Sequence, residues 1–296
     1  MRVEDLDGPR VRPGLEARIL DELAWLGLPW DVEAAPPASA SPGARLGPSA
    51  DGVYRQSARL PLYAEVLERL RAAGLAYPCF CSRAEIARAA QAPHASDEGP
   101  RYPGTCRALP AAERVARAAR RPPAWRFLVP EGPVSFVDGV HGPCAFDVAA
   151  AVGDFVVMRA DGVPAYQLAV AVDDAAMGIT EVVRGDDLLP STARQLLLHR
   201  ALGVEPPRFA HVPLVVGADG ERLAKRHGAL SLGELRERGA DPRDVVGLLA
   251  ALSGLADTGA RVEPNALVAG FRLERIPRGP ARLEPGAVEA LARAGA

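Results

Sequence analysis

The chain has 296 residues, and its 35 basic and 37 acidic side chains give a formal net charge of −2, so no overall basic signature indicates nucleic-acid binding. A hydrophobic share of 48% is ordinary for a globular protein, and four cysteines are too few for a disulfide scaffold. No apolar run is long enough for a membrane span, and the first residues are not typical of a secretory signal. We therefore expect a cytoplasmic protein.

The first third of the chain predicts two amphipathic helices. Apolar side chains recur at helical spacing between Pro13 and Gly27 and again between Leu62 and Gly74, where the glycines are typical of helix ends. In chain order we expect a short strand at residues 1–7, a helix at 13–27, a loop rich in Ala, Pro and Ser at 34–49, and a second helix at 62–74. The next segment, 77–107, has weak periodicity and much Gly and Pro, so something other than an apolar core must order it.

From Ala165 the pattern is typical of an α/β protein. The continuous apolar run Tyr166–Val172 predicts a strand, and we expect the strand Glu181–Val183 to be buried. Ser191 is expected to cap a helix that ends at Gly203. The other predicted elements are a helix near 111–121, strands at 125–129, 134–137, 155–159 and 211–216, and a tail helix N-capped by Asp241 with Val245, Leu248, Leu249 and Leu252 inward.

Three of the four cysteines lie between positions 79 and 106. Cys79 and Cys81 are one residue apart, so their thiolates can reach one ion, and Cys106 can close the site after a loop. This spacing favours a structural Zn²⁺ over three inert core cysteines. The fourth ligand stays open on the residues alone, the candidates being Tyr102, His94, Asp97 and Cys144.

Polar residues at the ends of apolar segments are candidates for substrate binding. Arg184 follows a strand and precedes a helix, where it could clamp a carboxylate or phosphate or simply form a surface ion pair in a turn. Tyr166 and Glu4 stand out as polar side chains on otherwise apolar strands, although either could be a rim residue without function. His211 is more often structural than catalytic in such a position.

Lys225 is the only lysine of the chain, so the other 34 of the 35 basic side chains are arginine. An ammonium is a compact charge on a flexible stem, which suits a moving phosphate better than a planar guanidinium does. By itself, a single surface lysine could equally be a compositional leftover.

In this order, the motifs resemble the class I glutamyl-tRNA synthetase catalytic core, and most closely its short paralogues, the glutamyl-Q tRNA(Asp) synthetases. The resemblance covers nearly the whole chain. Glu221–Gly228 is similar to the second class I signature, the KMSKS-type loop, with Ala224 where serine is usual. The other matching runs are Ala165–Asp174, Glu181–Leu189 and Ser191–Gln195.

The resemblance implies an α/β fold with an N-terminally incomplete Rossmann-like core, an inserted zinc-bearing α+β domain and a short helical C-terminal region. The resemblance implies four parts. Residues 1–76 would form the first part of the core and residues 77–153 the inserted acceptor or zinc-binding domain. Residues 154–230 would form the second part of the core with the KMSKS-like loop, and residues 231–296 the helical region. Because little chain follows the core, the short paralogue fits better than a full synthetase.

The resemblance also implies a reaction: L-glutamate is activated by ATP with Mg²⁺, and its glutamyl group passes to queuosine at the wobble position of tRNA(Asp). Glu4 would pair with the substrate ammonium, Tyr166 would hydrogen-bond the amino acid, and Arg184 would bind a carboxylate. Lys225 would be catalytic and bind the ATP phosphates. The paralogues' zinc site would make Tyr102 the fourth ligand beside the three cysteines, with one structural Zn²⁺ per chain. We expect a monomer.

One family feature is missing from these residues. In the family, some forty residues with the His-Ile-Gly-His-type ATP-binding signature precede the strand that resembles residues 1–7. We expect that the start lies at an internal methionine, and that residues 1–296 alone do not activate glutamate. The alternatives are a truncated glutamyl-tRNA synthetase catalytic domain and a non-catalytic RNA-binding module.

Overall fold

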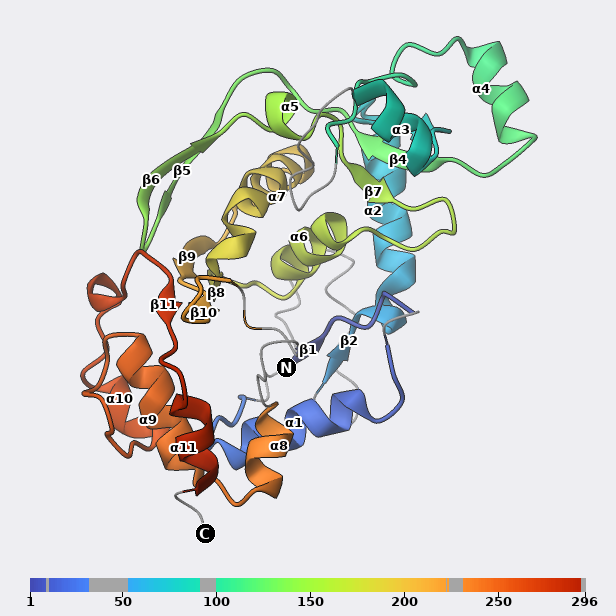
Figure 1. Cartoon of the computed structure of the whole chain (residues 1–296). Coiled ribbons are helices and arrows are strands. Elements are labelled where there is room, and N and C mark those ends of the chain that lie inside the picture. Colours follow the sequence, from blue (N-terminus) through green and yellow to red (C-terminus); the bar gives the residue numbers. More distant parts are fainter. Residues whose placement is uncertain (9–10, 32–52, 91–99, 222, 224–230, 294–296) are drawn as a thin grey trace.

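The computed structural model describes residues 1–8, 11–31, 53–90, 100–221, 223 and 231–293. Figure 1 shows an elongated molecule with the C-terminal helices at one end and α3 (Arg83–Ala90) and α4 (Ala111–Ala118) at the other. Within the part of the chain that the structure describes, no helix is both long and apolar enough to cross a membrane.

The N-terminal elements follow the predicted helix signals. The first helix starts after Gly14, and Gly27 with φ 73° ends it; the second buries the predicted stripe from Leu62 to Leu70, with Gly74 at φ 72° beyond its end. Both helix predictions are confirmed. Only Arg2 and Val3 of the predicted first strand are extended in a sheet. These elements are β1 (Arg2–Val3), α1 (Leu15–Trp25), β2 (Tyr54–Arg55), η2 (Gln56–Arg59) and α2 (Leu60–Ala72), with β1 and β2 parallel.

An antiparallel sheet and two short helices follow α2. Its strand order is β3-β4-β7, and it lies at the far end of α2 in Figure 1. The turn predicted at Asp161-Gly162 follows β7, and Gly162 has φ 82°. The elements of this part are β3 (Ala76–Cys79), α3 (Arg83–Ala90), α4 (Ala111–Ala118), β4 (Ala124–Phe127) and β7 (Val156–Met158).

A four-stranded sheet with the order β6-β5-β9-β8 carries the residues that matter most for the site. Strands β8 and β9 are parallel and place Arg184 opposite His211. Strand β5 pairs with β9 through Asp138 and Phe209, and with β6 as a hairpin. The elements are β5 (Val134–Asp138), β6 (Gly142–Phe146), α5 (Val148–Ala151), α6 (Tyr166–Ala176), β8 (Glu181–Gly185), η3 (Asp186–Leu188), α7 (Leu189–Leu202) and β9 (Arg208–Val212).

Four predictions in this part are wrong. Tyr166–Val172 forms the start of helix α6, because a run that is apolar apart from Gln167 and the Tyr166 hydroxyl fits a buried helix as well as a buried strand. Ser191 lies inside α7 rather than at its N-cap, and its hydroxyl accepts from Gln167 Nε2 at 3.1 Å. Strand β8 is not buried as predicted: it lies at the edge of its sheet, and Val183 is 59% exposed. The strand predicted from 211 to 216 is split into β9 and β10.

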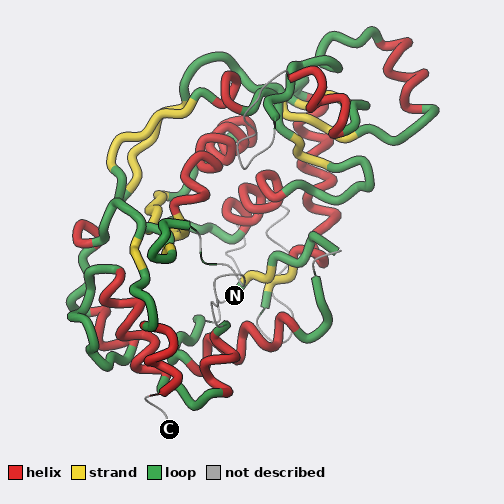
Figure 2. The backbone as a smooth tube through the Cα atoms, in the orientation of Figure 1, coloured by secondary structure: helices red, strands yellow, loops and turns green. Residues whose placement is uncertain are grey.

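The C-terminal part is helical, as predicted, and it packs on the end of α1 (Figure 2). The Asp241 carboxylate caps α9 by accepting from the N–H of Arg243, while Val245 faces inward and Leu249 is 43% exposed, contrary to the prediction for Leu249. The elements are β10 (Val215–Val216), α8 (Leu232–Glu237), α9 (Pro242–Leu252), α10 (Pro264–Val268), η5 (Leu273–Arg275), β11 (Ala281–Arg282) and α11 (Ala287–Arg293).

A buried carboxylate joins α2 to α6. Asp173 has no exposed surface and accepts hydrogen bonds from Gln56 at 2.9 Å, Arg59 at 2.8 Å and Tyr63 at 2.8 Å. Burying a charge is costly unless it is paired and hydrogen-bonded, and here a guanidinium and two neutral donors meet that need. The network therefore fixes α6 on α2 and, with it, the position of Tyr166 at the start of α6.

Candidate active site and metal centre

The three residues predicted to bind glutamate come from three elements in the middle of the molecule (Figure 1). Glu4 follows β1, Tyr166 begins α6 and Arg184 lies near the end of β8. Burial raises the pKa of Tyr166, and the charges of Arg184 and Glu4 act on the same hydroxyl. The fold thus brings the three side chains within electrostatic range of one another.

An ion-pair chain holds Glu4 in place. Arg2 donates to Asp174 at 2.6 Å and to Glu4 at 3.3 Å, so the guanidinium bridges the buried Asp174 and the exposed Glu4. These groups line a cavity of about 460 Å³ beside β8, which Tyr166 and Arg184 do not line. Exposed carboxylates next to a small cavity can pair with a substrate ammonium.

Arg184 is held on one edge of its guanidinium. Its Nε donates to His211 Nε2 at 3.0 Å, and its Nη2 donates to Thr192 Oγ1 at 2.8 Å and weakly to the Leu188 carbonyl at 3.4 Å. Burial lowers the pKa of this guanidinium, which nevertheless stays charged. A fixed, partly desolvated fork of this kind is suited to binding a carboxylate.

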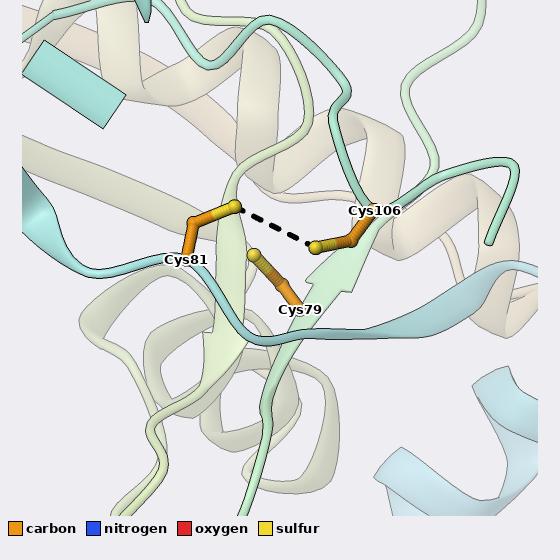
Figure 3. Close-up of side chains that lie close together, drawn as sticks. All are labelled: Cys79, Cys81 and Cys106. Atoms are coloured by element: carbon orange, nitrogen blue, oxygen red, sulfur yellow. Dashed lines mark hydrogen bonds between the residues drawn. The ribbon is translucent and has the colours of Figure 1, made fainter. Parts of the chain in front are cut away.

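The three clustered cysteines converge on one point, as Figure 3 shows. Their Sγ atoms all lie within 4.8 Å of one another, and Cys81 Sγ is 3.5 Å from Cys106 Sγ. Four ligands at about 2.3 Å around a tetrahedral ion would separate sulfurs by about 3.7 Å, so the thiols could hold a metal ion such as zinc. Cys79 and Cys106 are buried and Cys81 is half-buried.

Tyr102 completes this cluster. Its hydroxyl is 3.3 Å from Cys79 Sγ and 4.0 Å from Cys81 Sγ, and it accepts a hydrogen bond from the Cys106 N–H at 2.9 Å. Its backbone is packed so tightly against Gly153 that a Cβ there would lie 2.4 Å from the Tyr102 carbonyl oxygen. The position fits a fourth ligand, which remains a prediction.

A buried arginine lies against the cluster. The guanidinium of Arg126 is 3.7 Å from the centre of the Tyr102 ring, and its side chain is 8% exposed. Burial opposes ionisation of Cys79, but contacts with Tyr102, the Cys81 backbone and Arg126 outweigh it, and the pKa of Cys79 is lowered. The surroundings therefore favour a thiolate at Cys79, the form that binds metal, whereas burial and the neighbouring thiols raise the pKa of Cys81 to about 12.

The other candidate residues do not join these sites or lie outside the described residues. Cys144 lies on β6, where its thiol donates to the Gly142 carbonyl at 3.5 Å, and it is not part of the cysteine cluster. His94, Asp97 and Lys225 lie outside the described residues, so the structure says nothing about them.

Sequence reasoning missed Asp138 and gave His211 only a structural role. Both side chains are completely buried, and His211 Nδ1 is 2.6 Å from Asp138 Oδ2. In the sequence, the signal for Asp138 was its position as a polar residue at the end of an apolar strand. The same kind of position singled out Arg184 as a candidate for substrate binding. The contact itself depends on β5 and β9 becoming neighbours, which no local pattern reveals.

Two buried histidines predict loss of stability in mild acid. Burial lowers the pKa of both His199 and His211, whose side chains have no exposed surface. In the unfolded chain their pKa is about 6.5, so below that pH the unfolded state binds more protons than the folded state and stability falls. We expect each histidine to lower the free energy of unfolding by up to about 1.4 kcal/mol for every pH unit below about 6.5, until the pH reaches the pKa of that histidine in the folded protein. Urea unfolding at pH 7.5 and 5.5 measures this, and equal stability at both would contradict it.

Comparison with known proteins agrees with this geometry. The profile described as "tRNA synthetases class I (E and Q), catalytic domain" matches residues 1–262. The chain therefore belongs to this family of class I synthetase catalytic domains, which are ligases. The predicted resemblance and the predicted α/β class I synthetase fold are both confirmed.

Its relatives within the family are more specific. The glutamyl-Q tRNA(Asp) synthetase of Symbiobacterium thermophilum is 50% identical over 98% of this chain and 87% of that protein. A glutamate–tRNA ligase of Syntrophus aciditrophicus is 41% identical, but the chain covers only 54% of it. A solved glutamate tRNA ligase from Elizabethkingia meningosepticum, in complex with its amino acid, superposes with a TM-score of 0.77 at 28% identity, over 98% of this chain and 61% of that one.

Proposed function

We propose that the chain is a glutamyl-Q tRNA(Asp) synthetase, which activates L-glutamate with ATP and transfers the glutamyl group to queuosine of tRNA(Asp). The observation that carries the proposal is 50% identity to such a synthetase across nearly the whole of both chains. The chain spans little more than half of the full-length glutamate–tRNA ligases it matches, which makes a tRNA-charging enzyme the second candidate.

The proposed roles follow from charge and position. Glu4, paired with Arg2, binds the ammonium of glutamate, and Tyr166 hydrogen-bonds the amino acid. Arg184 receives a carboxylate; its guanidinium is held by His211 and Thr192 and lies within hydrogen-bond reach of Tyr166. Lys225 neutralises charge on the phosphates of ATP, which binds with Mg²⁺.

The cysteine cluster and Tyr102 would hold one structural Zn²⁺. When bound, the ion supplies cross-linking rather than chemistry, because a tetrahedral site with four protein ligands has no open position for substrate. It would join β3 to the segment around Cys106, where Tyr77, Phe80 and Ile86 pack with the cysteines and Tyr102 in a small hydrophobic cluster. The division into domains at residues 76, 153 and 230 is proposed on the same resemblance.

Two assays test the proposal. Glutamate-dependent ATP–pyrophosphate exchange should be seen, with aspartate and glutamine as controls, and labelled glutamate should attach to queuosine-containing tRNA(Asp) but not to tRNA lacking queuosine. Assaying both residues 1–296 and a form extended by the in-frame residues upstream of Met1 makes the result independent of where the chain begins.

Each outcome discriminates between the candidates. Attachment to the 3′ end of tRNA(Glu), instead of to queuosine, would identify a glutamate–tRNA ligase. Absence of exchange in both forms would contradict either enzyme and favour a non-catalytic RNA-binding module. The form with exchange activity is called the active form below.

A further inference from the structure

Asp138 and His211 form a buried acid–imidazole pair that the proposed roles above leave unused. Asp138 ends β5 and His211 lies on the adjacent strand β9. Oδ1 of Asp138 accepts three backbone N–H groups, from Val140 at 3.0 Å, His141 at 3.0 Å and His211 at 3.2 Å. The other oxygen, Oδ2, faces the His211 ring at 2.6 Å. One carboxylate thus fixes both the loop after β5 and the orientation of the imidazole.

The contacts on its two sides determine the tautomer of His211. A carboxylate oxygen only accepts, so Nδ1 must carry the proton that it shares with Asp138. Nε2 must then be the acceptor, because Arg184 Nε, 3.0 Å away, can only donate. The opposite tautomer would set two N–H groups against each other. Burial lowers the pKa of His211, and backbone donors help to lower that of Asp138, which agrees with a neutral imidazole beside an ionised carboxylate.

The imidazole in turn orients Arg184. Arg184 Nε donates to His211 and Arg184 Nη2 donates to Thr192. These two hydrogen bonds on one edge of the guanidinium fix the orientation of its plane. The Nη1 end is the part that these hydrogen bonds do not use. A carboxylate bound at Nη1 depends on the direction of this planar group, which a rotation about the last side-chain bonds would change.

We propose that Asp138 and His211 are positioning residues for glutamate binding: Asp138 holds His211 in its Nδ1–H tautomer, and His211 aims the guanidinium of Arg184 at the substrate carboxylate. The inference rests on the proposed function in that Arg184 binds glutamate. It also gives Asp138, from the segment predicted as an inserted domain, a direct effect on the amino-acid site.

The test is Asp138→Asn in the active form. The amide can keep the backbone N–H groups bonded through its oxygen, but its NH₂ then faces Nδ1, which must give up its proton. We expect His211 to change to the Nε2–H tautomer in ¹⁵N NMR of histidine-labelled protein. The KM for glutamate should rise about 10-fold to 100-fold, as is typical when a residue supporting a ligand-binding group is lost, with the KM for ATP within about twofold.

His211→Asn is the second variant and His199→Asn is the matched control. Asparagine at 211 can still donate to Asp138 but cannot reach Arg184, so it should raise the KM for glutamate even if Asp138→Asn does not fold. His199 is equally buried, and among the described residues its ring is hydrogen-bonded to the Ala171 carbonyl, at 3.1 Å, rather than to Arg184 or Asp138, so its replacement should lower stability without changing that KM.

An Nε2–H tautomer in the wild-type protein would overturn the inference. So would a glutamate KM within about twofold of wild type in folded Asp138→Asn or His211→Asn protein. Failure of the proposed function looks different, since the wild-type active form would then show no glutamate-dependent exchange at all, while the tautomer of His211 could still be measured.

Discussion

Replacing Arg184 by alanine is expected to lower kcat/KM for glutamate by about two to three orders of magnitude in the exchange assay. Removing one partner of a desolvated, hydrogen-bonded charge pair costs about 2–5 kcal/mol, because the substrate carboxylate is left without its counter-charge. The loss should appear mainly in the KM for glutamate, whereas the KM for ATP should change little. Arg184→Lys should recover only part of it, since an ammonium keeps the charge but not the planar fork.

Arg208→Ala is the matched control for this prediction. Arg208 lies on β9, beside β8, but its side chain is 81% exposed, and among the described residues it pairs with Glu181 at 3.2 Å. Exposed pairs of this kind contribute about 0–1 kcal/mol, so exchange and stability should be close to wild type. If Arg184→Ala exchanged as fast as Arg208→Ala, Arg184 would have no part in glutamate binding.

Replacing Cys106 by serine is expected to remove the metal. The purified protein should contain about one Zn²⁺ per chain, and the variant almost none, because a serine hydroxyl is a poor substitute for a thiolate ligand. Without the ion, residues 77–107 should become sensitive to proteolysis, since binding energy at a structural zinc site contributes directly to folding. Metal analysis by mass spectrometry and limited proteolysis measure the two effects.

Three further variants locate the ligands. Cys79→Ser should behave like Cys106→Ser, while Cys144→Ser should keep its zinc, because Cys144 lies outside the cluster on β6. Tyr102→Phe removes only the hydroxyl and should weaken zinc binding if the phenolate is a ligand. Full zinc occupancy in both Cys79→Ser and Cys106→Ser would place the metal elsewhere.

The sequence by itself determined those features that depend on neighbouring residues. The helices ending at Gly27 and Gly74 follow from apolar spacing and from glycines that adopt positive φ. The approach of Cys79 to Cys81 was predictable because a single residue separates them, whereas Tyr102 as the fourth ligand stays a prediction. In each case, a short stretch of chain carries both the signal and its structural consequence.

Only the tertiary structure decided the rest. In the run Tyr166–Val172, residues 167–172 are buried in a helix that packs against α2, α7 and β7, while Tyr166 is 39% exposed. A run that is apolar apart from Gln167 and the Tyr166 hydroxyl cannot show whether its period is 2 or 3.6. The contact of Asp138 with His211 joins residues 73 positions apart through the pairing of β5 with β9. That pairing is set by packing of the whole chain, so the orientation of Arg184 could not be read from its own segment.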